Sequence, residues 1–161
     1  MSYILVVDDE KDIRDLISQI LFDEGHLVKL AHNSSSAMQY INTEVPDLIV
    51  LDIWLKDSEM DGIEILKSVK LNNPLCPVVI ISGHGNIEIA VAAVKQGAYD
   101  FLEKPFNIDQ LVLVINRALE ASSLRKEVFS LKNQENQENK MIGDTTTFRN
   151  LKQKLDKLLK S

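Results

Sequence analysis

Short runs of apolar residues alternate with amphipathic helical patterns five times between residues 3 and 118. The clearest run covers residues 48–51, Leu-Ile-Val-Leu, and is followed at once by Asp52. An uninterrupted run of this kind is typical of a strand that is buried on both faces, as in a parallel sheet. Parallel neighbours need a crossover connection, and here the connections have helical spacing. We therefore expect an α/β fold, in which helices cover both faces of a parallel sheet.

Turn-forming residues separate the expected strands from the expected helices. Gly25 and Gly97 are placed to end helices, the serines at 34–36 to cap one, and Pro74 to stop another. The helices themselves are marked by apolar residues at intervals of three and four. Together these signals predict one doubly wound domain over about residues 1–120. The expected strands are residues 3–7, 27–30, 48–52, 77–81 and 99–102, and the last expected helix begins at Ile108.

Composition limits the functions that are open to the chain. Its 161 residues, 45% of them hydrophobic, can build the core of one ordinary domain plus an appendage. The formal net charge of -6 argues against a general nucleic-acid or anionic-membrane surface. Cys76 is the single cysteine, so no internal disulfide can form, and the three histidines show no zinc-type spacing. No signal-like or membrane-spanning run is present, so we expect a cytoplasmic protein.

Polar side chains follow the ends of four expected strands. Asp8 and Asp9 come after the first strand, Asp52 ends the third, Ser82 follows the fourth and Lys104 follows the last. In open α/β sheets the ligand crevice lies beyond the carboxyl ends of the strands. If the strands are neighbours, these side chains meet at one edge of the sheet. The sequence therefore predicts a single polar site at that edge.

The residue types at this edge suit phosphoryl transfer. Crowded carboxylates either raise one another's pKa or bind a cation, and Mg²⁺ prefers hard oxygen ligands together with phosphate oxygens. Lys104 can pair with a phosphoryl oxygen, and the Ser82 hydroxyl can donate a hydrogen bond to it. With the developing charge stabilised in this way, the carboxylate of Asp52 can attack phosphorus. The predicted product is an aspartyl phosphate on Asp52.

The set Asp8-Asp9, Asp52, Ser82 and Lys104-Pro105 resembles the receiver domain of bacterial two-component response regulators, over about residues 1–120. The resemblance implies a flavodoxin-like sheet of strand order 2-1-3-4-5. It also implies phosphotransfer from a sensor histidine kinase to Asp52, in a signalling domain that is not an enzyme in its own right. The ligands that the resemblance implies for Mg²⁺ are Asp9, Asp52 and the backbone carbonyl of Trp54, with Asp8 acting through water.

The resemblance also implies a conformational switch. Ser82 would turn toward the phosphoryl group and Phe101 would repack, which alters the face formed by the fourth helix, the last strand and the last helix. A homodimer is expected through the fourth and last helices, extended through residues 124–131. A cis peptide is expected between Lys104 and Pro105, since proline permits one at modest cost.

Finer details resemble a subgroup of this family. Residues 82–87 and 98–106 are similar to receivers of the NtrC group, and the loop at 52–62 is similar to its NtrX branch. Most receivers have a shorter loop here, which leaves the path of the Trp54 carbonyl open. In the subgroup an AAA+ ATPase module and a DNA-binding helix-turn-helix follow the receiver.

The end of the chain is interpreted in the light of that subgroup. We expect residues 121–140 to form a helical linker, and residues 141–161 to be the start of a truncated AAA+ module or an amphipathic helix. No G-x-x-x-x-G-K-[ST] loop occurs, so no ATPase activity is assigned to this chain. Contacts with DNA would be made only by domains outside it.

Other interpretations of the same residues stay open. Asp8 and Asp9 could be helix-start charges, Ser82 a helix cap and Lys104 a solvated loop lysine. Trp54 could anchor a partner or cover the site. A haloacid-dehalogenase-type phosphatase is the rival enzyme, but its nucleophile and acid lie two residues apart after the first strand. The remaining rival is a receiver-like module that binds partners without being phosphorylated.

Overall fold

The structure of the chain, a computed structural model, describes residues 2–83 and 87–142, with side chains described as far as residue 131. The chain forms two compact units, Met1–Leu119 and Glu120–Ser161. The sheet and the helices that cover it belong to the first unit. No helix in the described ranges is long and apolar enough to cross a membrane.

Five parallel strands form one sheet in the order β2-β1-β3-β4-β5. The predicted flavodoxin-like fold and strand order are therefore confirmed. All residues of β1, β3 and β4 are buried, as expected for strands with helices on both faces. The strands are β1 (Tyr3–Val7), β2 (Leu27–Ala31), β3 (Leu48–Asp52), β4 (Val78–Ser82) and β5 (Asp100–Glu103).

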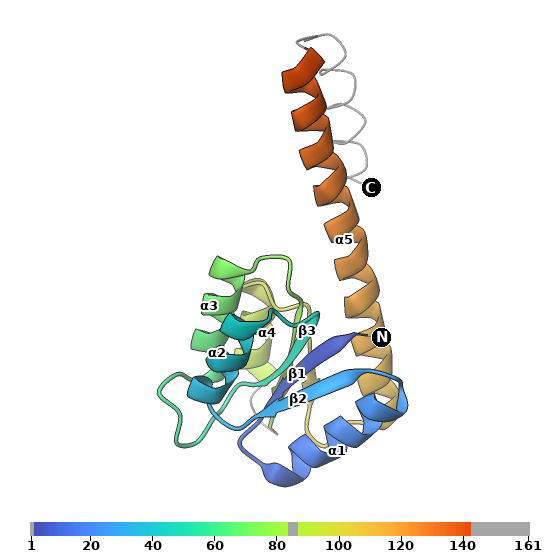
Figure 1. The fold of residues 1–161 in the computed structure, drawn as a ribbon. Helices are drawn as coiled ribbons and strands as arrows, with labels where there is room; N and C mark the ends of the chain where they lie inside the picture. Colours follow the sequence, from blue (N-terminus) through green and yellow to red (C-terminus); the bar gives the residue numbers. More distant parts are fainter. Residues whose placement is uncertain (1, 84–86, 143–161) are drawn as a thin grey trace. The chain divides into compact units, whose positions relative to one another are not determined.

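Helices cover the two faces of the sheet, because successive strand side chains point to opposite sides. Leu5 and Val7 of β1 join the core beneath α2, α3 and α4, whereas Ile4 and Val6 join the core beneath α1 and the start of α5 (Figure 1). The strands β1, β3 and β4 are therefore packed from both faces, which fixes the positions of their ends. The helices are α1 (Lys11–Asp23), α2 (Ser34–Thr43), α3 (Gly62–Asn72), α4 (Ile87–Lys95) and α5 (Ile108–Ile142).

Local capping sets where the helices begin and end. Gly25 and Gly97, predicted to end helices, follow α1 and α4 and have positive φ angles of 87° and 118°. The predicted serine cap of α2 is one residue too late. Asn33 is the N-cap, because its side-chain oxygen accepts the Ser36 N–H at 2.9 Å, and Ser36 completes the capping box.

Helix α5 runs without a break from Ile108 to Ile142, although the apolar stripe of the sequence fades before its end. Leu124, Phe129 and Leu131 on this helix are about half exposed. Residues 143–161 lie outside the described residues. The boundaries at 120 and 140, and the expected start of an AAA+ module at 141–161, stay predictions.

Candidate functional site

Asp52 and Asp8 lie side by side at the carboxyl edge of the sheet. Val7 of β1 pairs with Leu51 of β3, so the next residue of each chain segment is one of these two aspartates. Asp8 is fully buried and the exposed fraction of Asp52 is 4%. The Asp8 N–H is held by the carbonyl of Ala31 at 3.1 Å, which fixes the backbone at this position. The sheet thus forces two carboxylates into one buried space.

Lys104 brings a positive charge to both carboxylates. It directly follows β5, and its N–H donates to the Ser82 carbonyl at 2.7 Å. Its Nζ lies 2.9 Å from Asp8 Oδ2 and 3.2 Å from Asp52 Oδ2. The peptide bond to Pro105 is cis, as the resemblance implied. The structure therefore brings Asp8, Asp52 and Lys104 together, as the strand-end pattern predicted.

The ionisation of this group is strongly altered. Burial, together with the nearby charge of Asp8, raises the pKa of Asp52 to about 7, although Lys104 acts in the opposite direction. Burial also raises the pKa of Asp8, against hydrogen bonds from the Glu10 N–H and Lys104. Burial alone would lower the pKa of Lys104, but the hydrogen bond to Asp8 and the charge of Asp52 raise it. One ammonium group is thus not enough to stabilise both anions.

The acidic residues after β1 suit a divalent cation. Carboxylate oxygens of Asp8, Asp9 and Glu10 lie within 4.8 Å of one another. An all-oxygen donor set of this kind fits Mg²⁺, which binds few protein carboxylates and keeps several waters. Glu10 was not among the predicted ligands, although its Oε1 also lies 3.7 Å from Lys104 Nζ. The signal in the sequence that could have indicated Glu10 is the run of three acidic residues, Asp8-Asp9-Glu10.

The loop after β3 reaches back to these carboxylates through its backbone. The Trp54 N–H donates to Asp52 Oδ1 at 3.3 Å, and the Lys56 N–H donates to Asp9 Oδ2 at 3.2 Å. The Trp54 side chain is 53% exposed, so the indole is not a core residue. The predicted role of its carbonyl as a metal ligand stays a prediction.

Gly62 closes this loop onto the site. A Cβ atom at this position would overlap the carbonyl oxygen of Asp52 and lie 2.6 Å from the Cα of Ile53. The Gly62 N–H also donates to the Ile53 carbonyl at 2.9 Å. The sequence pattern at Asp61-Gly62 indicates only that a helix begins there. The need for glycine comes from a close backbone approach that no local pattern reveals.

Ser82 and Phe101 occupy the neighbouring strands. Ile81 pairs with Asp52, so Ser82 is the next residue along β4, and its side chain is fully buried. The Ser82 hydroxyl has no hydrogen-bond partner within the part of the chain that the structure describes. Phe101 is half-buried against the core beneath α4. Residues 84–86, which include His84, lie outside the described residues.

Arg14 is a further residue that the sequence analysis missed. Its guanidinium Nη1 donates to the backbone carbonyl of Asp8 at 2.8 Å. Arg14 lies on the first turn of α1, where its side chain can reach back to the end of β1. A basic residue one turn after an acidic strand end is a weak signal, because most such residues are solvated. Its contact fixes the backbone that carries Asp8.

Known proteins share this fold and sequence. The family model described as response regulator receiver domain matches residues 4–116. The nitrogen assimilation regulatory protein NtrX of Azorhizobium caulinodans is 50% identical over 96% of this chain and 34% of its own length. The chain thus spans about a third of the length of the curated relatives that it matches.

Solved structures agree with the sequence matches. The crystal structure of the receiver domain of NtrX from Brucella abortus is 57% identical, with a TM-score of 0.71, over 73% of this chain and 98% of that one. The solution structure of the beryllofluoride-activated NtrC4 receiver domain dimer is 40% identical, with a TM-score of 0.69, over 74% of this chain and 98% of that one. The chain belongs to the response regulator receiver domain family, and within it to receivers of the NtrX and NtrC type.

Proposed function

We propose that this domain accepts a phosphoryl group on Asp52 from a sensor histidine kinase, in the cytoplasm. The observation that carries the proposal is the position of the Asp52 carboxylate. It is buried at the end of the central strand β3, next to Asp8 and 3.2 Å from Lys104 Nζ. Membership of the receiver family supports the same role.

Each neighbouring group has a part in the transfer. An Asp52 oxygen forms a bond to phosphorus while the bond from phosphorus to the imidazole nitrogen of the kinase's phosphohistidine breaks. Lys104, which now pairs with Asp52 Oδ2, is placed to pair with a phosphoryl oxygen instead. The Trp54 N–H holds the other oxygen, Oδ1, in position. The buried Ser82 hydroxyl supplies a further donor.

Asp9, Asp52 and the carbonyl of Trp54 would hold Mg²⁺, with Asp8 acting through water and Glu10 close by. When bound, Mg²⁺ supplies a charge that keeps Asp52 ionised and offsets the negative phosphoryl oxygens. The raised pKa of Asp52 supports this assignment, because a metal-free site holds more negative charge than Lys104 can balance. The clustered carboxylate oxygens of Asp8, Asp9 and Glu10 support the choice of a cation that prefers oxygen ligands.

Phosphorylation would be transmitted by Ser82 and Phe101 to the face of α4, β5 and α5. The Ser82 hydroxyl, which has no hydrogen-bond partner among the described residues, is available to bind a new acceptor, and Phe101 is packed only partly into the core. Exposed apolar side chains on this face support a homodimer through α4 and α5, and a dimer is the form of the activated NtrC4 receiver. In the whole protein, AAA+ and DNA-binding domains would respond to the altered face of α4, β5 and α5. The exposed residues are Ile87, Val91, Tyr99, Ile108 and Leu113.

Intact-mass measurement after incubation with acetyl phosphate and Mg²⁺ tests the proposal. We expect one stable added phosphoryl group, which Asp52→Asn abolishes. Asp57→Asn is the control, because Asp57 is an exposed aspartate on the same loop. Rapid turnover of acetyl phosphate without an adduct would support a phosphatase. No adduct and no turnover would support a module that only binds partners.

A further inference from the structure

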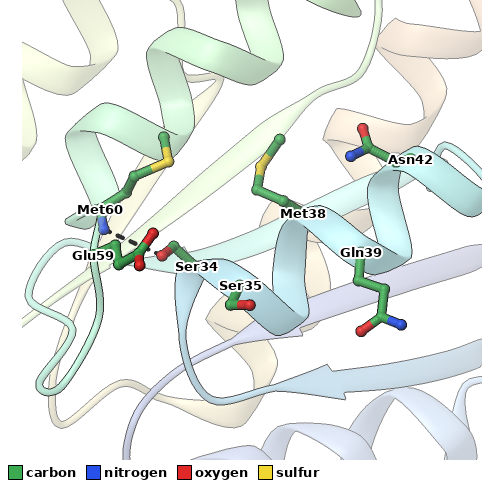
Figure 2. Close-up of a pocket in the computed structure, with 7 residues that line it drawn as sticks. All are labelled: Ser34, Ser35, Met38, Gln39, Asn42, Glu59 and Met60. Atoms are coloured by element: carbon green, nitrogen blue, oxygen red, sulfur yellow. Dashed lines mark hydrogen bonds between the residues drawn. The ribbon is translucent and has the colours of Figure 1, made fainter.

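The loop between β3 and α3 is tied to the first turn of α2 by a closed ring of three hydrogen bonds. The Ser34 N–H donates to Ser58 Oγ at 2.8 Å, and the Ser58 hydroxyl donates to the Met60 carbonyl at 2.7 Å. The Met60 N–H donates to Ser34 Oγ at 3.1 Å, which closes the ring (Figure 2). We call these three residues the serine clamp.

Two members of the serine clamp, Ser34 and Met60, line a pocket of about 410 Å³ between α2 and the loop (Figure 2). The Ser34 side chain is buried at the helix start, where the first backbone N–H groups have no partner inside the helix. Ser58 satisfies one of those groups from outside. The Ser34 N–H at the start of α2 therefore finds its acceptor in Ser58, and this hydrogen bond ties α2 to a loop that is distant in sequence.

The same loop contacts the phosphorylation site. Trp54 and Lys56 donate their N–H groups to Asp52 and Asp9, two of the carboxylates that we assign to Mg²⁺. The chain then turns at Asp57, which has a positive φ of 52°, and Ser58 follows directly. The position of Ser58 thus limits where the backbone of residues 54–56 can lie.

We propose that Ser58, held by Ser34, is a positioning residue that sets the affinity of the site for Mg²⁺ and the rate of phosphorylation of Asp52. The inference rests on the function proposed above. Without the Ser58 hydroxyl the loop is still attached by Gly62 and by Leu55 and Met60, which pack on the core. The stretch that carries the two donor N–H groups would lose the hydrogen bonds that fix the chain shortly after Lys56.

Weaker Mg²⁺ binding by Ser58→Ala would not be the result of a general loss of stability. Ser58 is half-buried and belongs to neither hydrophobic core, so water can replace its hydroxyl. The fold would therefore survive Ser58→Ala with a modest loss of stability. A loosened loop would instead move the Trp54 and Lys56 N–H groups relative to Asp52 and Asp9, which changes the metal site directly.

Mg²⁺ titration of the whole chain tests this inference. Binding is followed by calorimetry and by the emission of Trp54, which is the single tryptophan. We expect Ser58→Ala to weaken Mg²⁺ binding by roughly tenfold, the lower end of what outer-shell partners of metal ligands contribute. Ser58→Thr, which keeps the hydroxyl, should restore it. Ser35→Ala is the matched control, because Ser35 is the exposed neighbour of Ser34 and takes no part in the ring.

The outcomes separate this inference from the proposed function. Equal Mg²⁺ affinity in the wild type and Ser58→Ala, or equal loss in Ser58→Thr, would overturn the clamp and leave phosphorylation of Asp52 untouched. A wild type that neither binds Mg²⁺ nor gains a phosphoryl group would overturn the function itself. Thermal melting without metal checks that each variant is folded. If Ser58→Ala is unfolded, Ser58→Cys takes its place, since a thiol has a similar shape and hydrogen-bonds weakly.

Discussion

The two edges of the sheet are built differently. At the amino edge, the Tyr3 N–H donates to Asp47 Oδ2 at 2.8 Å, and Lys70 Nζ donates to the Cys76 carbonyl at 2.6 Å. At the carboxyl edge, Asp8 and Asp52 share Lys104, and the pKa of each carboxyl group is raised. At the amino edge these two donors, a backbone N–H and an ammonium group, find acceptors within the chain. The carboxyl edge keeps an excess of buried negative charge, which either a bound cation or a proton on Asp52 would relieve.

The free-energy cost of burying incompletely compensated charge is therefore concentrated at the carboxyl edge of the sheet. Burying a charge without full compensation is unfavourable, so such sites persist where they serve binding or catalysis. A lysine is present at each edge, but Lys70 donates to neutral carbonyl oxygens while Lys104 faces carboxylates. Variants of these two lysines should therefore behave differently.

The largest expected effect is that of Lys104→Met. Removing one partner of a buried ion pair leaves uncompensated charge, and we expect the free energy of unfolding to fall by about 3 kcal/mol. Lys70→Met, which loses hydrogen bonds to carbonyl groups, should cost only about 1 kcal/mol. Urea denaturation at pH 7.5 without metal measures both. Equal losses would mean that the two edges do not differ in the way described.

Asp52→Asn should act in the opposite direction and stabilise the metal-free domain. The raised pKa means that ionised Asp52 opposes folding, and each tenfold change in acidity corresponds to about 1.4 kcal/mol. We expect the free energy of unfolding at pH 7.5 to rise by about that amount or more. At the amino edge, Asp47→Ala should instead reduce stability, because it removes the acceptor of the Tyr3 N–H. Added Mg²⁺ should stabilise the wild type more than Asp52→Asn.

The pH dependence of stability separates the two edges further. Because the pKa of Asp52 is raised in the folded state, the folded chain holds a proton that the unfolded chain has lost. The contribution of Asp52 to stability should therefore fall as pH rises from about 4 to about 7. The measurement is the difference between wild type and Asp52→Asn in metal-free denaturation curves. Subtraction removes the effects of groups that do not interact with Asp52, such as His26, whose pKa is lowered mainly by burial. A flat difference would contradict the raised pKa.

Most of the fold was predictable from the sequence, because each buried strand is a short apolar run and each connection has helical spacing. The end of β4 was placed one residue early. Ser82 belongs to the strand because its backbone carbonyl accepts the Lys104 N–H, a pairing that does not depend on its polar side chain. The N-cap of α2 was missed for another reason: Asn33 and the serines after it have nearly equal capping ability, so the sequence alone does not select one of them.

The core of the site was also predictable, because parallel strands bring Asp8, Asp52 and Lys104 to one edge whatever their side chains do next. The approach of Glu10 to Lys104 was not, since it depends on the rotamers of two long side chains. The serine clamp could not be predicted either, because Ser34 and Ser58 are 24 residues apart and Ser58 lies in an irregular loop. The structure shows where the predicted site residues lie, but the phosphoacceptor, metal-binding and switch roles assigned to them all stay predictions.

The smallest expected effect concerns the exposed Trp54, which follows Asp52 by two residues. Its N–H is bound to Asp52 Oδ1, so the indole starts at the edge of the site, and a bulky apolar group there would hinder the approach of water to an acyl phosphate. We expect Trp54→Asn to shorten the lifetime of the aspartyl phosphate several-fold, whereas Lys56→Asn, on the same loop, should leave it nearly unchanged. Decay after removal of acetyl phosphate, followed by intact mass, gives both rates. An unchanged rate in Trp54→Asn would mean that the indole does not cover the site, and its exposure would then favour contact with a partner protein.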